Sequence, residues 1–462
     1  MKKGLGYVIF MAVVAAIGGI LFGYDTAVIS GTTEIVKSQF SLSDIKEGWY
    51  VGCALIGSIA GVLVAGSLSD YLGRKLTMLI SAALFSISAI GCAVCASFDG
   101  LVAYRIIGGV GIGIVSIVSP IYISEVSPAK IRGTLVSLYQ LAVTVGFLLA
   151  YLTNWVIDSN ATAAAGNATE LWTKMFHTEM WRGMLGSETI PALLFFIIIF
   201  FIPESPKWLI VNGKIDKASL VLGKIYADQT EVKKEIAVTS ESLAGENKGA
   251  WSDLVKPGIL LAVIAGSAIA ILGQFMGVNA VLYYGPKIFA DAGFDNPMFS
   301  TVLVGVVNCV TTVLAVFIID KVGRKQLIYW GVSGMILCLL AIGTYFAWGS
   351  ALGLGNGFML TFFLAYVFCC AISISAIVFV LLSEMYPNSV RGRAMSIAGF
   401  ALWIGTYLIG QLTPVLLGWS QAGTFFIFAA MCIPYMLIMW RVIPETTGKT
   451  LEEIEAYWIR KK

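Results

Sequence analysis

Long apolar runs follow one another along most of the chain, and short polar stretches separate them. A run of about 20 apolar residues is long enough to cross the hydrocarbon core of a membrane as an α-helix. A longer polar stretch, 204–257, divides the runs into two sets of six. The pattern predicts membrane helices over residues 7–29, 47–68, 76–97, 101–123, 134–157, 184–202, 258–285, 299–320, 326–348, 357–383, 393–418 and 422–443.

The composition supports a membrane protein. The chain is 58% hydrophobic and 12% charged, whereas a soluble domain has about 25% charged residues. Its net charge of +3 gives no reason to expect a nucleic-acid partner. The eight cysteines all lie in apolar runs and the chain has a single histidine. We therefore expect the lipid bilayer as a partner, and no metal site, cofactor or enzyme active site.

Two polar motifs occur twice, once in each half of the chain. Asp-Tyr-Leu-Gly-Arg-Lys at 70–75 returns as Asp-Lys-Val-Gly-Arg-Lys at 320–325, and Glu-x-x-Pro-x-x-x-Arg-Gly occurs at 125–133 and 384–392. Internal repeats made of membrane spans are typical of secondary transporters. We expect an all-α membrane protein with twelve transmembrane helices in two pseudo-symmetric six-helix lobes.

The repeat and the polar stretch define the expected domains. They are an N-terminal lobe over 1–203, a linker over 204–257, a C-terminal lobe over 258–443 and a short tail over 444–462. Apolar positions at helical spacing beside lysines predict amphipathic helices in the linker. Basic residues gather in the loops on one side of the predicted spans, which the positive-inside rule makes cytoplasmic. Both termini are then cytoplasmic, and the short loops and tails favour a bacterial inner membrane.

Three ionisable residues lie within predicted spans of the first half: Asp25, Arg105 and Glu188. A charge near the middle of a bilayer costs roughly 2.5–3.5 kcal/mol on insertion scales, so such a residue is a candidate for function. An aspartate that alternates between pairing with arginine and binding a proton would couple transport to a proton gradient. A static ion pair that only holds helices together is the alternative.

Uncharged polar and aromatic residues gather mainly in the spans of the second half. The repeat aligns Asp25 with Asn279, 254 residues later, so an acid corresponds to an amide. Amides both donate and accept hydrogen bonds, and aromatic faces stack on sugar rings, which suits a neutral polyol. Hydrogen bonds between helices are the alternative for each residue. The candidates are Gln140, Gln274, Asn279, Tyr283, Asn308 and Trp403.

The repeated motifs place opposite charges at the cytoplasmic ends of the spans. Glycine permits a tight reversal between helices, and the arginine after it can pair with acidic residues of neighbouring helices. We expect ion pairs that latch the two halves on the inner side in one state, which is a gating role. Two ordinary charged loops are the alternative. The candidates are Asp70, Arg74, Glu125, Arg132, Asp320, Arg324, Glu384 and Arg391.

Further motifs make nearly the whole chain resemble the sugar porter family of the major facilitator superfamily. They are Phe-Gly-Tyr-Asp-Thr-Ala-Val at 22–28, Tyr-Arg at 104–105, Pro-Glu-Ser-Pro-Lys-Trp-Leu at 203–209, Gln-Phe-x-Gly-x-Asn at 274–279 and Pro-Glu-Thr-x-Gly-Lys-x-Leu at 444–451, together with the repeated motifs. The resemblance is closest to the bacterial proton-linked xylose/hexose symporters.

The resemblance implies roles for the candidate residues. Asp25, Arg105 and Glu188 match the proton-coupling positions of those symporters. Glu204 and Glu445, within the family motifs, join the predicted gating residues. The positions that match sugar-binding residues are Gln140, Gln274, Asn279 and Asn308.

Several positions depart from the family pattern. The usual Gln-Gln pair of the seventh span is Gly273-Gln274, and a polar residue before Trp403 in many relatives is Leu402. An expected tryptophan of the tenth span is Phe379, which still offers a ring for the predicted sugar site but no N–H donor. These departures leave the choice of sugar open.

The sequence thus predicts a symporter that uses the proton as its coupling ion and needs no other cofactor. It imports a neutral monosaccharide, a hexose or pentose such as fructose, xylose or a glucose-like sugar, and functions as a monomer. The alternatives are a passive sugar or cyclitol uniporter and a non-transporting sugar sensor. Sensors that resemble this family tend to carry long cytoplasmic tails, and this chain ends shortly after the last span.

Overall fold

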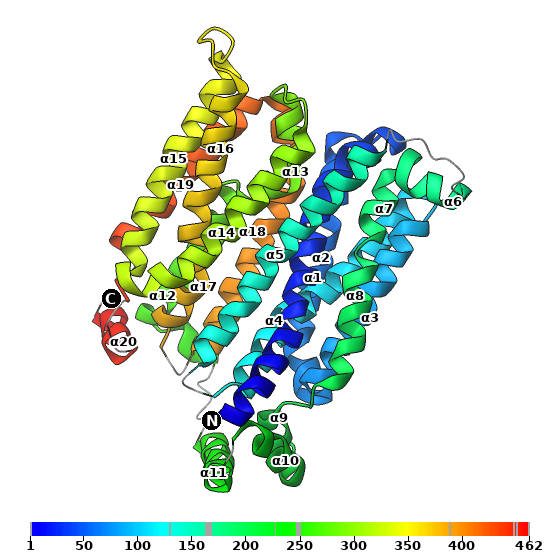
Figure 1. Ribbon diagram of the computed structural model, residues 1–462. Coiled ribbons are helices and arrows are strands. Elements are labelled where there is room, and N and C mark those ends of the chain that lie inside the picture. The colour runs from blue at the N-terminus through cyan, green and yellow to red at the C-terminus, as the bar shows by residue number, and fades with distance from the viewer. Residues whose placement is uncertain are drawn as a thin grey trace. The chain divides into compact units, whose positions relative to one another are not determined.

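The computed structural model describes residues 2–128, 131–161, 169–226, 228–245, 251–387, 390–446, 449 and 451–460. In these ranges the regular structure is helical throughout (Figure 1). Twelve segments are long and apolar enough to cross a membrane, which confirms the predicted number and the all-α membrane fold. Large apolar side chains such as Leu63, Phe317 and Leu337 remain exposed, as lipid-facing positions require.

The first six spans include five helices without a break and one that is divided. They are α1 (Lys2–Phe40), α2 (Asp44–Leu72), α3 (Arg74–Val94), α4 (Phe98–Val126), α5 (Arg132–Asn160), and a sixth span made of α7 (Met180–Gly186), α8 (Thr189–Ile198) and a short 3-10 turn, Ile199–Phe201. A small helix, α6 (Glu170–Thr173), and a π-helical turn, Lys174–Thr178, precede the sixth span.

The last six spans include two divided ones. They are α12 (Pro257–Phe275) with α13 (Val278–Asp291), α14 (Pro297–Val322), α15 (Arg324–Trp348), α16 (Asn356–Cys370) with α17 (Ala376–Met385), α18 (Arg391–Trp419) and α19 (Gln421–Arg441). A π-helical turn, Ala371–Ser375, joins α16 to α17. A final short helix, α20 (Leu451–Arg460), contacts α12 and α17.

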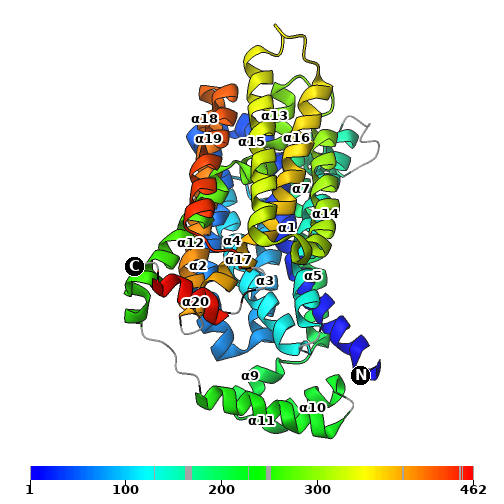
Figure 2. The same ribbon diagram turned by 90° about the vertical axis from the view of Figure 1, so that its left-hand side faces the viewer.

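The polar stretch after the sixth span forms three short helices. They are α9 (Pro206–Val211), α10 (Ile215–Ile225) and α11 (Gln229–Gly245), and a 3-10 turn, Trp251–Val255, follows them. In α10, Leu222 and Ile225 are buried while Lys217 and Lys224 are exposed, which is the amphipathic pattern that the sequence indicates. Figure 2 shows α10 and α11 lying across the direction of α3 and α5.

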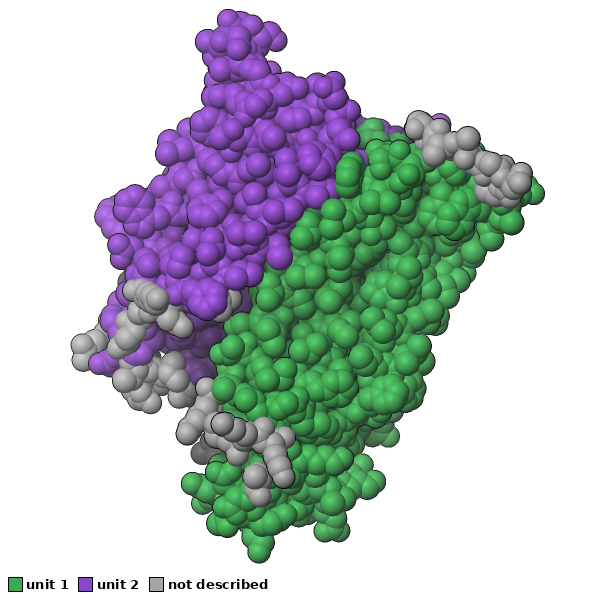
Figure 3. Space-filling view, viewed as in Figure 1, with its two compact units in different colours: residues 1–35, 53–246 green, residues 36–52, 247–462 purple. Residues whose placement is uncertain are grey.

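The chain divides into two compact units, which Figure 3 colours separately. Unit 1 contains residues 1–35 and 53–246, and unit 2 contains residues 36–52 and 247–462. The division does not follow the two halves of the sequence. The hairpin that ends α1 and begins α2, residues 36–52, belongs to the unit that holds the last six spans.

Ion pairs and a hydrogen bond fasten this hairpin within unit 2. The Glu47 side chain is completely buried and accepts from Lys37 Nζ at 2.6 Å and from Lys287 Nζ at 2.9 Å. Lys287 lies on α13, and Gln411 of α18 donates to the Ile45 carbonyl at 2.9 Å. The hairpin is therefore held by α13 and α18. Hydropathy gave no indication of this arrangement.

Candidate substrate and proton sites

A buried ion pair joins two spans of unit 1. Arg105 Nη1 on α4 lies 3.1 Å from Asp25 Oδ1 on α1, and each side chain is only 3% exposed. Gly23 brings this part of α1 close to α5, because a Cβ atom at Gly23 would lie 1.9 Å from the Val143 carbonyl oxygen. The structure therefore brings together the aspartate and arginine that the sequence singled out.

Glu188 lies beside this pair, at the turn between α7 and α8. It is buried, and its carboxyl group interacts electrostatically with Asp25 and Arg105. The preceding residue, Ser187, lies 2.6 Å from the hydroxyl of Tyr24. The sequence pointed to Glu188 but not to the break in its span, although polar residues at helix breaks are a recurring feature of transporters.

The seventh span is broken between two residues predicted to bind sugar. Gln274 is the penultimate residue of α12, and Asn279 lies in the first turn of α13. Gly277 between them has a φ of 89°, in the left-handed region that favours glycine, and a Cβ there would lie 2.3 Å from the Phe428 ring. Asn279 Nδ2 donates to Gln274 Oε1 at 2.6 Å. The break thus brings the two amides together.

A threonine of the eleventh span completes this amide cluster. Thr406 on α18 is buried, and its Oγ1 donates to Gln274 Oε1 at 3.1 Å. The sequence analysis missed Thr406. Its spacing from Trp403, one helical turn earlier on α18, was the available signal.

The other predicted sugar-binding residues are spread over both units. Gln140 on α5 belongs to unit 1 and is exposed, and Phe379 on α17 is 52% exposed. Three more belong to unit 2 and are buried: Tyr283 on α13, Asn308 on α14 and Trp403 on α18. Their contact with sugar stays a prediction.

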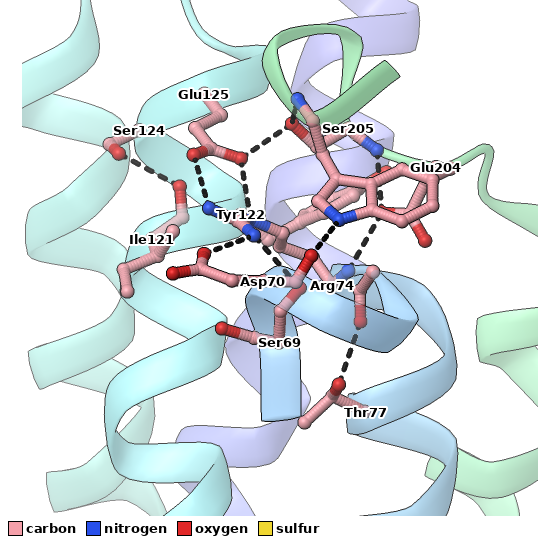
Figure 4. A network of polar contacts seen from close by, with 12 residues as sticks. Ser69, Asp70, Arg74, Thr77, Ile121, Tyr122, Ser124, Glu125, Glu204 and Ser205 are labelled. Carbon is pink, nitrogen blue, oxygen red and sulfur yellow. Dashed lines mark hydrogen bonds and ion pairs between the residues drawn. The ribbon is translucent and has the colours of Figure 1, made fainter. Parts of the chain in front are cut away.

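A polar cluster stands at the joint of α2 and α3, where Gly73 has a φ of 96° (Figure 4). Arg74 donates to both carboxylate oxygens of Glu125, at 3.0 and 3.1 Å. It also donates to Asp70 Oδ1 at 2.9 Å and to the Ser69 carbonyl at 2.8 Å. One guanidinium therefore joins the end of α2 to the end of α4.

Glu204 binds the first turn of α3 in the same cluster. Its carboxylate accepts from the backbone N–H groups of Arg74 at 2.9 Å and Lys75 at 3.2 Å, where a helix N-terminus favours negative charge. The next residue, Ser205, donates to Glu125 Oε2 at 2.5 Å. Partial burial raises the pKa of Glu204, and its backbone hydrogen bonds oppose that shift.

Unit 2 repeats this arrangement at the joint of α14 and α15, where Gly323 has a φ of 97°. Arg324 Nη2 donates to Glu384 Oε1 at 3.0 Å, and the backbone N–H of Lys325 donates to Glu445 at 3.2 Å. Thr446 donates to Glu384 Oε2 at 2.5 Å. Ser205 and Thr446, which follow the two Pro-Glu pairs, are equivalent residues that the sequence analysis missed.

Two further predicted gating residues, Arg132 and Arg391, each donate to a backbone carbonyl group. Arg132 donates to the Ser127 carbonyl at 3.5 Å, and Arg391 donates to the Tyr386 carbonyl at 3.2 and 3.3 Å. The side chain of Asp320 lies outside the described part of the structure. The ion pairs described for Arg74 and Arg324 each lie within one unit, so a latch between the units stays a prediction.

These observations define a class of protein. Twelve spans, a joint repeated in both units, and polar residues at broken membrane helices are the features of a secondary transporter. A family model described as "Sugar (and other) transporter" matches residues 11–458. The chain therefore belongs to the sugar transporter family of the major facilitator superfamily, whose members are transporters and not enzymes.

Individual relatives agree with this assignment. The chain is 39% identical to the arabinose-proton symporter of Bacillus subtilis (strain 168), over 99% of this chain and 97% of that protein. It is 37% identical to the D-xylose-proton symporter of Escherichia coli (strain K12), over 98% and 96%. The inward open conformation of the xylose transporter XylE from E. coli matches with a TM-score of 0.84 and 36% identity, covering 98% of this chain and all of that one.

Proposed function

We propose that this sugar transporter is a proton-coupled symporter that imports a neutral monosaccharide, with a pentose as the favoured substrate. The observation that carries the proposal is the buried cluster of Asp25, Arg105 and Glu188, which has one carboxyl group more than it has guanidinium groups. A fully ionised cluster would hold an uncompensated negative charge within a membrane span, which is costly. Binding of one proton removes that charge.

Coupling follows from competition for Asp25. When Asp25 is ionised, it pairs with Arg105, and the pair links α1 to α4. When Asp25 is protonated, this ion pair is weakened, and the two helices are free to change their contact. A gradient that delivers the proton from outside and removes it inside would then drive the transporter in one direction.

The amide cluster supports a neutral sugar as the cargo. Gln274, Asn279 and Thr406 carry hydrogen-bonding groups but no charge, so they suit hydroxyl groups and not an anion. The names of the relatives, an arabinose-proton symporter and a D-xylose-proton symporter, favour a pentose. We further propose an inner-membrane location with both termini in the cytoplasm, the monomer as the functional unit, and a gating role for the clusters around Arg74 and Arg324.

The test is transport by purified protein in liposomes. With no pH gradient imposed, each sugar of a panel that includes L-arabinose, D-xylose, D-glucose, D-fructose and a cyclitol is added outside. We expect the external medium to become more alkaline with the transported sugar, and a protonophore, which carries protons freely across the membrane, to abolish this pH change. Uptake of a sugar without any pH change would identify a passive uniporter and contradict the coupling.

A further inference from the structure

Gln274 is held on two sides by neighbours with different roles. On one side Asn279 donates to its Oε1, and on the other α18 approaches closely at Gly405, where a Cβ atom would lie 3.2 Å from Cβ and Cγ of Gln274. The glycine therefore lets the next residue, Thr406, reach the amide. A larger residue at 405 would push the two helices apart.

The single hydroxyl proton of Thr406 has two acceptors within reach. Its Oγ1 lies 3.1 Å from Gln274 Oε1 and 2.9 Å from the Leu402 carbonyl oxygen. A hydroxyl donates only one hydrogen bond at a time but also accepts. The hydroxyl therefore donates to one of these two oxygens at a time, and when it donates to Gln274 Oε1 it resists rotation of that amide.

The orientation of the Gln274 amide determines which hydrogen-bond donors and acceptors are left for a ligand. With Gln274 Oε1 engaged by Asn279 and Thr406, the structure gives Gln274 Nε2 and Asn279 Oδ1 no hydrogen-bond partner among the described residues. Both residues remain partly exposed. The two N–H groups of Gln274, the second N–H of Asn279 and the Asn279 carbonyl oxygen are then left for a ligand, a set that can donate to one sugar hydroxyl and accept from another.

We propose that Thr406 is a positioning residue that fixes the orientation of the Gln274 amide and so sets the pattern of donors and acceptors offered to the sugar. The proposal rests on the proposed function, because it assumes that Gln274 and Asn279 bind the sugar. It also bears on the departure from the family's usual Gln-Gln pair, since this chain has Gly273 before its one glutamine at this place. An amide held in one orientation loses less freedom on binding than a mobile one.

The experiment compares Thr406→Val, which keeps the shape but removes the hydroxyl, with Thr406→Ser, which keeps the hydroxyl. Each is measured for half-saturation and maximal rate in sugar counterflow, an exchange that needs no net proton movement, with L-arabinose and D-xylose as probes. Loss of one hydrogen bond predicts a half-saturation raised about fivefold in Thr406→Val with an unchanged maximal rate. Thr406→Ser should stay within about twofold of the parent, since its hydroxyl preserves the bond.

A second pair of variants separates this proposal from the proposed function. In a Gln274→Ala background, Thr406→Val should change half-saturation no further, because the amide that Thr406 positions is absent. Equal effects of Thr406→Val in both backgrounds, or no effect in either, would overturn the positioning role. If Gln274→Ala alone leaves half-saturation unchanged, the sugar site itself is refuted. Unfolding temperatures of the detergent-solubilised variants check that each one is folded.

Discussion

Asp25 in unit 1 and Asn279 in unit 2 occupy matching positions of the internal repeat, each two residues after a glycine, yet their surroundings differ. Asp25 lies inside the unbroken helix α1 and pairs with Arg105, whereas Asn279 opens α13 after a break and pairs with Gln274. Gly23 is helical and lets α5 approach, and Gly277 has a positive φ and ends a helix. The same short motif therefore serves close packing within an unbroken helix in one unit and a break within a membrane span in the other.

The difference shows where the repeat has been kept and where it has diverged. The joints at Gly73 and Gly323 have nearly the same backbone angle, and in each the first turn of the following helix binds a carboxylate. The membrane-embedded sites are unlike: one holds buried charge and the other holds amides. Under the proposed function this difference predicts a division of labour, in which unit 1 binds the proton and unit 2 supplies the principal hydrogen bonds to the sugar.

Removing the charge of the unit 1 site should have the largest effect. Asp25→Asn deletes the carboxylate that competes for a proton and for Arg105, so we expect complete loss of sugar accumulation driven by a proton gradient. Sugar counterflow should persist, because it needs no net proton movement. Both are measured with radiolabelled sugar in liposomes. Asp99→Asn, at an exposed aspartate of α4, is the matched control, and accumulation by Asp25→Asn would refute the coupling role.

The reverse change places a carboxylate in the amide cluster of unit 2, at the position that matches Asp25. Asn279→Asp removes the donor that lies 2.6 Å from Gln274 Oε1 and sets two acceptor oxygens against each other. We expect half-saturation for the sugar to rise about tenfold or more, as for loss of a hydrogen bond that leaves a polar group unsatisfied. Counterflow measures it. Asn296→Asp, at the cap of α14, makes the same chemical change outside the site and should leave half-saturation unaltered.

The two inner joints can be compared by the same substitution in each. Lysine keeps the charge of arginine but not the two-pronged geometry. Arg74→Lys breaks a double hydrogen bond to the partly buried Glu125 and should lower the free energy of unfolding by about 1–3 kcal/mol. Arg324→Lys should cost less, because its partner Glu384 is 26% exposed whereas Glu125 is 8% exposed, and a more exposed ion pair contributes less to stability. Unfolding temperatures in detergent measure both, and a larger loss for Arg324→Lys would reverse the ranking.

The smallest expected effect is on the pH dependence of stability. Because burial raises the pKa of Glu204, the folded protein holds that proton more tightly than the unfolded chain does. Its contribution to stability is therefore present below the ordinary carboxyl pKa and is lost as pH rises through the raised value. Glu204→Gln should remove this decline, so that the unfolding temperature depends less on pH above the ordinary glutamate pKa of about 4. Glu231→Gln, at an exposed glutamate of α11, should keep the parent's slope.

Much of the fold could be predicted from hydropathy and the repeat. Apolar length predicts a span, and the doubled Gly-Arg-Lys motif predicts two similar joints, so the twelve spans and the pairing of Arg74 with Glu125 were accessible. Helix breaks were not, since Met276 and Gly277 lie within a run that is apolar on average. Hydropathy averages over a window and gives no signal for a change in one φ angle.

Residues that act through a neighbouring side chain were also difficult to predict from the sequence. Thr406 is one hydroxyl among several in the spans. Its spacing from Trp403 places it on the same side of α18, but its hydrogen bond to Gln274 is seen only in the structure. Ser205 gains its meaning from Glu125, which lies 80 positions earlier in the chain. Side chains at such separations are brought together by packing of whole helices, which local spacing does not encode.

The hairpin over 36–52 has a consequence for any attempt to divide the protein. A cut in the linker between Gly245 and Trp251 would separate the two sequence repeats, but it would not separate unit 1 from unit 2, because the hairpin would stay on the N-terminal fragment. The C-terminal fragment would lack Glu47, the buried partner of Lys287, together with the backbone that Gln411 binds. Produced alone, it would be unit 2 without the hairpin over 36–52. Co-expression with the N-terminal fragment would return the hairpin, so we expect the second half of the chain to need the first half in order to assemble.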